Sequence, residues 1–156
     1  MKTQIREFQA EDAESLSSLV IRTLRIISSQ EYAQGAIEAL VPFFTPGELL
    51  AKASSQYVIV CVLGGQLVGV ASLDGDRVRN VFVSADMQRR GIGRTLMARI
   101  EAKARDNGEK TIYLHSALSA QSFYEALGFT AKAPIDRELN GIPLPEIEME
   151  KHLTEG

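Results

Sequence analysis

Three strand-like runs follow one another in the middle of the chain, and glycine-containing turns separate them. The runs are Tyr57–Leu63, Gln66–Leu73 and Arg77–Val83, and all three are rich in β-branched and other apolar residues. Gly64-Gly65 joins the first two runs and is a strong signal for a two-residue hairpin turn, and Asp74-Gly75 supplies a second turn. The pattern predicts an antiparallel meander of three strands.

A helix and a further strand are predicted after the meander. Asn107-Gly108 ends the helix, and Thr111–His115 then has the character of a strand. A strand, a helix and a strand in this order form a crossover, which predicts parallel pairing between Arg77–Val83 and Thr111–His115. The apolar face of the helix consists of Ile92, Leu96, Met97, Ile100 and Ala104, which recur at helical spacing.

The remaining segments are shorter or less regular. Ile5–Phe8 is predicted as an opening strand, and an amphipathic helix begins near Asp12. Prolines interrupt the segment from Ser28 to Ala53, in which Glu48–Ala53 is predicted as a helix. The C-terminal part is predicted to hold a short helix over Ser119–Leu127, extended pieces at Phe129–Ala133 and Glu146–Lys151, and a turn-rich stretch between these pieces from Pro134 to Pro145.

Together these elements predict an α/β protein of the mixed α+β kind, with helices packed on a mixed sheet. The 156 residues contain no repeat and no linker, so we expect one domain over residues 1–156. The formal net charge of -3 argues against a broad nucleic-acid or membrane surface. No apolar signal core precedes Phe8, and we expect a soluble, cytoplasmic protein. Cys61 lies in an apolar run and is expected to be a buried hydrophobe, and the single cysteine rules out a cysteine metal cluster.

Candidate chemistry concentrates at the junction between the third strand and the long helix, where the sequence reads Gln88-Arg-Arg-Gly91-Ile-Gly93-Arg-Thr95. Glycines at a helix N-terminus let backbone N–H groups surround an anion, and the helix dipole favours negative charge there. A Rossmann motif requires a third glycine where Leu96 stands, and a P-loop requires lysine after Gly93. The glycines alone also fit a helix start that binds nothing.

A second motif, Phe123-Tyr124-x-x-x-Gly128-Phe129, follows about thirty residues later. The two motifs in this order resemble those of the GCN5-related N-acetyltransferases, and the resemblance covers about two thirds of the chain, from Tyr57 to the end. It implies a mostly antiparallel twisted sheet with a splayed parallel central pair. It also implies acetyl-CoA as co-substrate and no metal.

The resemblance assigns the binding of acetyl-CoA to both motifs and to the strand before them. The backbone of Val81, Phe82 and Val83 would hold the pantetheine arm, and one N–H group would face the thioester oxygen. Ser119 takes a position where many relatives have asparagine, which bonds the same arm. The pyrophosphate would be held by Gln88, Arg89, Arg90, Gly91, Ile92, Gly93, Arg94 and Thr95.

Two side chains are candidates for proton transfer. Tyr124 matches the family's general acid, and a phenol of pKa ~10 is close enough to a thiol of ~8.5 for proton transfer. The bulged strand carries glutamate as base in some relatives, whereas Arg77, Arg79 and Asn80 stand there in this chain. His115, with an ordinary pKa of ~6.5, is a candidate base at the end of the opposite strand.

The implied reaction is the direct acetylation of a primary amine, expected to belong to a small molecule. Pocket walls are expected from Tyr32, Phe43 and Phe44, and Arg22 and Arg25 are candidates for binding a carboxylate of the acceptor. Three alternatives stay open: a non-catalytic acyl-CoA-binding or sensing domain, an enzyme that acts on a protein amine, and an O-acyltransferase or user of longer acyl groups. Many relatives are dimers, so a homodimer also stays open.

Overall fold

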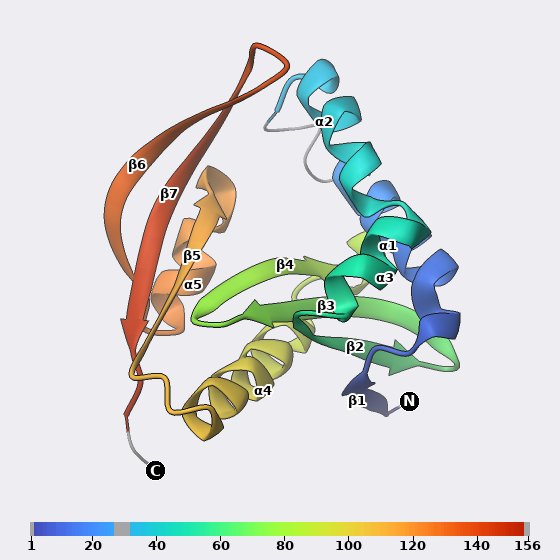
Figure 1. Cartoon of the computed structure of the whole chain (residues 1–156), viewed down its shortest axis with the longest axis horizontal. Helices are drawn as coiled ribbons and strands as arrows, with labels where there is room; N and C mark the ends of the chain where they lie inside the picture. Colours follow the sequence, from blue (N-terminus) through green and yellow to red (C-terminus); the bar gives the residue numbers. More distant parts are fainter. Residues whose placement is uncertain (1, 27–31, 155–156) are drawn as a thin grey trace.

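The structure is a computed structural model that describes residues 2–26 and 32–154. Within these residues seven strands form one sheet in the order β1-β2-β3-β4-β5-β7-β6 (Figure 1). The strands are β1 (Thr3–Glu7), β2 (Tyr57–Leu63), β3 (Gln66–Asp74), β4 (Arg77–Val83), β5 (Thr111–Ala117), β6 (Thr130–Leu139) and β7 (Ile142–His152). The α-helices are α1 (Ala13–Ile26), α2 (Gln34–Leu40), α3 (Pro46–Ala53), α4 (Ile92–Asp106) and α5 (Gln121–Ala126). Short 3-10 helices are η1 (Ala10–Asp12), η3 (Val41–Phe44), η4 (Ala85–Met87) and η5 (Leu118–Ala120).

The helices cover opposite faces of the sheet and create two buried layers. Side chains of α4 and α5 pack on one face, where Leu96, Ile100 and Tyr124 are buried with Val78 and Ile112. The helices α1 to α3 pack on the other face against β2 and β3, as Figure 1 shows on its right-hand side. None of the helices in the described ranges has the length and apolarity needed to cross a membrane.

The predicted meander and crossover are confirmed. β2, β3 and β4 pair in antiparallel fashion, and both glycines of the β2–β3 turn adopt positive φ angles, 58° at Gly64 and 78° at Gly65. β4 and β5 pair in parallel, as the crossover through α4 predicts. Their register contains a single pair, Arg77 with Tyr113, so the two strands separate beyond it. This separation opens the middle of the sheet.

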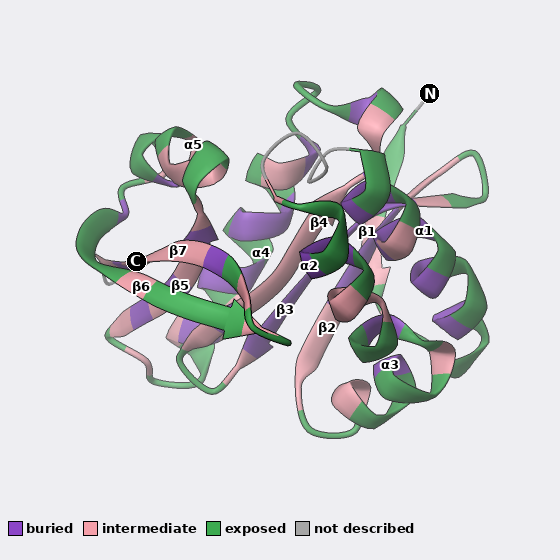
Figure 2. Cartoon of the chain, turned by 90° about the horizontal axis from the view of Figure 1, so that it is seen from above, coloured by how far each residue is buried: buried purple, intermediate pink, exposed green. Residues whose placement is uncertain are grey.

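The C-terminal hairpin differs from the sequence prediction. The stretch from Pro134 to Pro145 is expected to be rich in turns, yet all three of its prolines lie in strands of a long hairpin whose turn is at Asn140-Gly141. β6 is an edge strand, exposed along most of its length and green in Figure 2, so Pro134 interrupts no ladder on its outer side. Pairing of β7 with β5 begins at Glu146, so Pro143 and Pro145 also have a free edge.

The region before α3 was predicted only in part. Pro46–Ala53 forms the helix expected over Glu48–Ala53, while α2 (Gln34–Leu40) was not predicted. Thr45 caps α3 by accepting a hydrogen bond from the N–H of Glu48 at 3.3 Å. The first residues of the segment that the sequence treats as irregular, 28–31, lie outside the described residues.

Candidate active site

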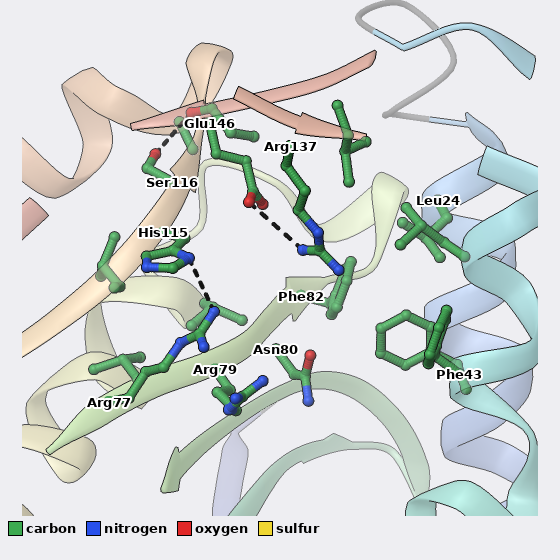
Figure 3. Close-up of a pocket in the computed structure, with 18 of the residues that line it drawn as sticks. Leu24, Phe43, Arg77, Arg79, Asn80, Phe82, His115, Ser116, Arg137 and Glu146 are labelled. Atoms are coloured by element: carbon green, nitrogen blue, oxygen red, sulfur yellow. Dashed lines mark hydrogen bonds and ion pairs between the residues drawn. The ribbon is translucent and has the colours of Figure 1, made fainter. Parts of the chain in front are cut away.

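A cavity of about 400 Å³ occupies the gap between β4 and β5. We call it the β4–β5 cavity. Its lining residues come from both faces of the sheet, because side chains of each strand alternate between the faces. Figure 3 shows polar and charged side chains at one end and apolar ones at the other. Its lining includes Leu24, Phe43, Lys52, Arg77, Arg79, Phe82, His115, Tyr124, Arg137 and Glu146.

A bulge in β4 shapes the wall of the cavity. The register with β3 shifts between Val70 and Ser72, and Asn80 within the bulge has a φ of 49°. Beyond the bulge the N–H of Ser84 donates to the carbonyl of Val68, so the backbone polar groups of Val83 and Val81 point the other way, toward the gap. Unpaired backbone groups on this edge are able to bond an amide-containing ligand.

This alternation separates the three predicted strand residues. Phe82 is paired with Val70 of β3, and its side chain lies in the wall of the cavity (Figure 3). The carbonyl of Val83 accepts a hydrogen bond from the side-chain amide of Gln88 at 2.6 Å. Gln88 thus braces the end of β4, and the backbone edge offered to a ligand is formed by Val81 and Val83.

The glycine motif forms the N-terminus of α4. Gly91 is the N-cap and adopts a φ of 82°, a left-handed conformation that favours glycine. Gly93 is needed for packing, because a Cβ there would lie 3.1 Å from Cζ of Phe123. The first N–H groups of α4, those of Ile92, Gly93 and Arg94, have no partner inside the helix. They provide the donors of the predicted anion site.

The side chains around this N-terminus are of two kinds. Arg89, Arg90 and Arg94 are exposed, and the first of them has a positive φ of 63°. The hydroxyl of Thr95 donates to the carbonyl of Gly91 at 2.8 Å and so supports the helix rather than pointing to a ligand. A groove lined by Arg90, Gly91 and Thr95 lies beside the helix start. Positive charge and free donors therefore meet at one place.

Tyr124 lies on α5 and reaches the cavity from the α4 face of the sheet. It is 8% exposed, and its ring packs edge-on against Phe123 and Phe129, with centroid distances of 5.0 and 5.7 Å. Burial raises the pKa of its phenol well above the ordinary value, so the hydroxyl stays protonated at neutral pH. Ser119 lies in η5 just before this helix and is exposed.

His115 lies on the other face of the sheet and is bonded to a cation. Nη2 of Arg77 lies 3.0 Å from Nδ1 of His115, and since a guanidinium only donates, Nδ1 is the acceptor (Figure 3). Burial, followed by the charge of Arg77, lowers the pKa of His115 and keeps the ring neutral. Nε2 then carries the proton and lies 4.0 Å from Glu148 Oε1. The one lone pair of this ring is occupied.

The structure adds a carboxylate that the sequence analysis did not single out. Glu146 on β7 is paired with Ala117 at the end of β5 and lines the cavity. Its Oε1 is buried without a hydrogen bond and has ion-pair contact with Nη1 of Arg137 at 3.5 Å. Burial raises the pKa of Glu146, and Arg137 opposes the shift only in part. Glu146, Glu148 and Glu150 alternate along the sequence and therefore lie on one face of the strand. This alternation was the sequence signal from which Glu146 could have been proposed as a site residue.

The predicted carboxylate-binding arginines do not line the cavity. Arg25 forms an ion pair with Glu38, with an Nη2–Oε1 distance of 2.8 Å, and Arg22 is exposed on α1.

The three aromatic residues expected as pocket walls, Tyr32, Phe43 and Phe44, all line the cavity. Among residues 2–26 and 32–154 no cluster of three or more metal-ligating side chains occurs. Cys61 is buried, and burial raises the pKa of its thiol.

Comparisons with known proteins agree on one family. The family model described as "Acetyltransferase (GNAT) domain" matches residues 28–153. The uncharacterized N-acetyltransferase YafP of Escherichia coli (strain K12) is 26% identical over 126 residues, which are 81% of this chain and 80% of YafP.

Solved structures have the same fold. A GCN5-related N-acetyltransferase from Rhodopseudomonas palustris matches with a TM-score of 0.91 and 25% identity, covering 98% of this chain and 97% of that one. PaiA N-acetyltransferase from Thermoplasma acidophilum, solved in complex with coenzyme A, matches with a TM-score of 0.82 and 19% identity, covering 97% and 99%.

Proposed function

The chain belongs to the GNAT acetyltransferase family, and from this membership we propose that it moves an acetyl group from acetyl-CoA to a primary amine of a small molecule. The observation that carries the proposal is the separation of β4 from β5 with Tyr124 beside the gap. A separated pair leaves backbone groups of β4 free to hold an acyl-CoA arm, and a protonated phenol is in place for the leaving thiolate.

The donor is proposed to lie on the α4 face. The pyrophosphate of acetyl-CoA would rest on the N-terminus of α4, where free N–H groups and three exposed arginines favour an anion. The pantetheine amides would bond the free edge at Val81 and Val83, with Ser119 on the opposite side. The coenzyme A complex of the Thermoplasma PaiA protein, which has this fold, supports the assignment of the ligand class.

The acceptor amine is proposed to enter from the face covered by α1 to α3. The residues just before α2 contact the β6–β7 hairpin there: the hydroxyl of Tyr32 donates to the carbonyl of Pro145 at 3.4 Å. A side chain at position 35 would also collide with Ile142, whose Cδ1 lies 2.7 Å from the site of a Cβ. An acceptor site bounded by these contacts suits a small molecule better than a protein segment.

Glu146 is the proposed base for the amine. A free alkylamine has a pKa of ~10.4 and must lose a proton before it attacks the thioester. A buried carboxylate whose pKa is raised accepts that proton more readily than an ordinary one. His115 is the second candidate, and it acts as a base only after its Nδ1 loses the hydrogen bond from Arg77.

Collapse of the tetrahedral intermediate completes the proposed reaction. An N–H group on the free edge of β4 would stabilise the oxyanion, the C–S bond would break, and Tyr124 would protonate the departing thiolate. The acetyl group ends on the amine. The proton that the nitrogen loses as the amide forms would return to the phenolate of Tyr124, while the base passes the proton taken from the free amine to water.

Release of free thiol tests this function. The purified protein is mixed with acetyl-CoA and a panel of primary amines, and the thiol is followed with a chromogenic disulfide. We expect amine-dependent release above the rate of acetyl-CoA hydrolysis. Tight binding of CoA without release for any amine would contradict the enzyme and favour an acyl-CoA-binding domain.

A further inference from the structure

Positive charge is in excess among the residues that line the β4–β5 cavity. Arg77 and Arg79, two residues apart on β4, point to the same face of the sheet, and Arg137 of β6 and Lys52 of α3 also line the cavity. Glu146 is the one carboxylate among the described lining residues. The chain as a whole has a net charge of -3, so this excess of cations is local.

The four cations differ in what they contact. Nε of Arg79 lies 3.3 Å from Asp74, and Arg137 faces Glu146. Nζ of Lys52 donates to the carbonyl of Phe43 at 2.6 Å and lies 4.4 Å from the ring centre of Phe44. Arg77 stands apart, because no carboxylate of the described residues forms an ion pair with it.

Arg77 has hydrogen-bonding capacity that the protein does not use. One Nη donates to the neutral His115, while its Nε is buried and bonds to no described residue. Burial and then the nearby charge of Arg79 lower the pKa of this guanidinium, which means that its charged form is poorly compensated. A planar carboxylate is the ligand that matches the fork of a guanidinium with two parallel hydrogen bonds.

The surroundings of Arg77 define the rest of the ligand. Arg77 and Glu146 line the same cavity, yet the two form no ion pair, so a gap separates a cation from an anion (Figure 3). A molecule with a carboxylate at one end and an amine at the other fits such a gap. Leu24, Phe43 and Phe82 form an apolar wall at the other end of the cavity, as Figure 3 shows.

We propose that the acceptor is a small amine that carries a carboxylate, of the α-amino-acid type with an apolar side chain. Its carboxylate binds Arg77, its amine faces Glu146, and its side chain lies against Phe82 and Phe43. The inference rests on the proposed acetyl transfer and names the acceptor class of that site. It replaces Arg22 and Arg25 as the carboxylate-binding residues.

Matched pairs of acceptors test the inference on the unmodified protein. Thiol release is measured with L-leucine against isoamylamine and with L-phenylalanine against phenethylamine, the members of each pair differing by the carboxylate. We expect kcat/KM to be at least about 10-fold higher for the amino acid, the value of a charge-assisted hydrogen-bond pair. Arg77→Gln should remove most of this difference, so that kcat/KM for the amino acid falls to within about 3-fold of kcat/KM for the matching amine in the same variant.

Two further measurements make the result specific. Arg99→Gln, on the exposed surface of α4, is the matched control and should preserve the preference. The Kd of CoA should be unchanged in Arg77→Gln, since the phosphates are assigned to the other face of the sheet. Equal kcat/KM values for the two members of each pair would overturn the carboxylated acceptor while leaving acetyl transfer intact. A loss of CoA affinity in Arg77→Gln as large as its loss of kcat/KM would do the same. If none of the amines, with or without a carboxylate, gave thiol release, the proposed function would be refuted and this inference with it.

Discussion

Replacement of Tyr124 by phenylalanine removes one oxygen atom and leaves the packing of the ring intact. The edge-on contacts with Phe123 and Phe129 involve the ring alone. No described residue bonds the hydroxyl, and burial is the sole cause of its raised pKa. The variant therefore leaves no protein group unpaired, and its free energy of unfolding should stay within about 1 kcal/mol of the original.

The effect on turnover should be much larger. A general acid contributes about 10²- to 10⁴-fold to a rate. The CoA thiol, with a pKa of ~8.5, is a fair leaving group even without an acid, which favours the lower half of that range. We expect kcat to fall about 10²- to 10³-fold, equivalent to roughly 3 to 4 kcal/mol of activation free energy.

Burial sharpens this expectation. The raised pKa of Tyr124 makes its phenol a weaker acid than an ordinary phenol of pKa ~10. The thiolate that forms beside it loses the same solvation, so both anions are disfavoured together. The hydroxyl then donates a hydrogen bond to the developing thiolate and transfers its proton as the C–S bond breaks.

Three measurements separate the acid role from a structural one. Thiol release at saturating acetyl-CoA gives kcat, titration with CoA gives Kd, and chemical denaturation gives stability. The matched control is Tyr57→Phe, which removes a hydroxyl from β2 outside the cavity and should leave kcat unchanged. A kcat within about 3-fold of the original, or parallel losses of kcat and CoA affinity, would refute the role.

Two other substitutions test the base and the glycine motif. Burial holds the pKa of Glu146 above its unfolded value, so its stabilising contribution is full below the unfolded pKa of ~4.3 and is lost as pH rises through the folded pKa. Glu146→Gln should consequently raise the Tm more at pH 7.5 than at pH 4, and equal Tm shifts at the two pH values would contradict a raised pKa. The same variant should reduce kcat by at least about 10-fold, and Glu148→Gln is the control. Gly93→Ala should weaken CoA binding and lower stability by about 1 to 3 kcal/mol, because its Cβ meets Phe123. Gly47→Ala, where nothing lies within 4 Å, should do neither, and an unchanged CoA affinity in Gly93→Ala would speak against the anion site.

Local patterns in the sequence sufficed for most of the sheet and for the long helix. Arg77–Val83 was predicted with the observed bounds, and α4 begins at Ile92 as expected. Both are set by nearby signals: an apolar run between turns and an apolar stripe that ends at Asn107-Gly108. The prolines near the C-terminus misled the prediction, because a proline is compatible with a strand whose edge is free and the sequence does not say which edges are free.

Some residues of the candidate site could also be predicted from local patterns and others could not. Tyr124 and the glycines lie in compact motifs, so they could be recognised in the sequence, and the structure brings Tyr124 to the gap. Glu146 and Arg77 line one cavity only because β7 inserts between β5 and β6, a pairing between segments far apart in the chain. The bond from Arg77 to His115 was equally hidden, although it decides which ring nitrogen is protonated. Such relations depend on tertiary pairing rather than on local pattern.

The β4–β5 cavity combines two charged groups whose hydrogen-bonding capacity the protein itself satisfies poorly. A buried Nε on Arg77 and a buried carboxylate oxygen on Glu146 both lack hydrogen bonds to described residues, and burial disfavours the charged form of each group. A fold selected for stability alone would bring this cation and this anion together or replace both with apolar residues. Their separation in one small cavity is what a ligand with opposite charges at its two ends would correct. Because the protein leaves both charges poorly compensated, a carboxylated amine gains more binding free energy at this site than an amine without the acid group.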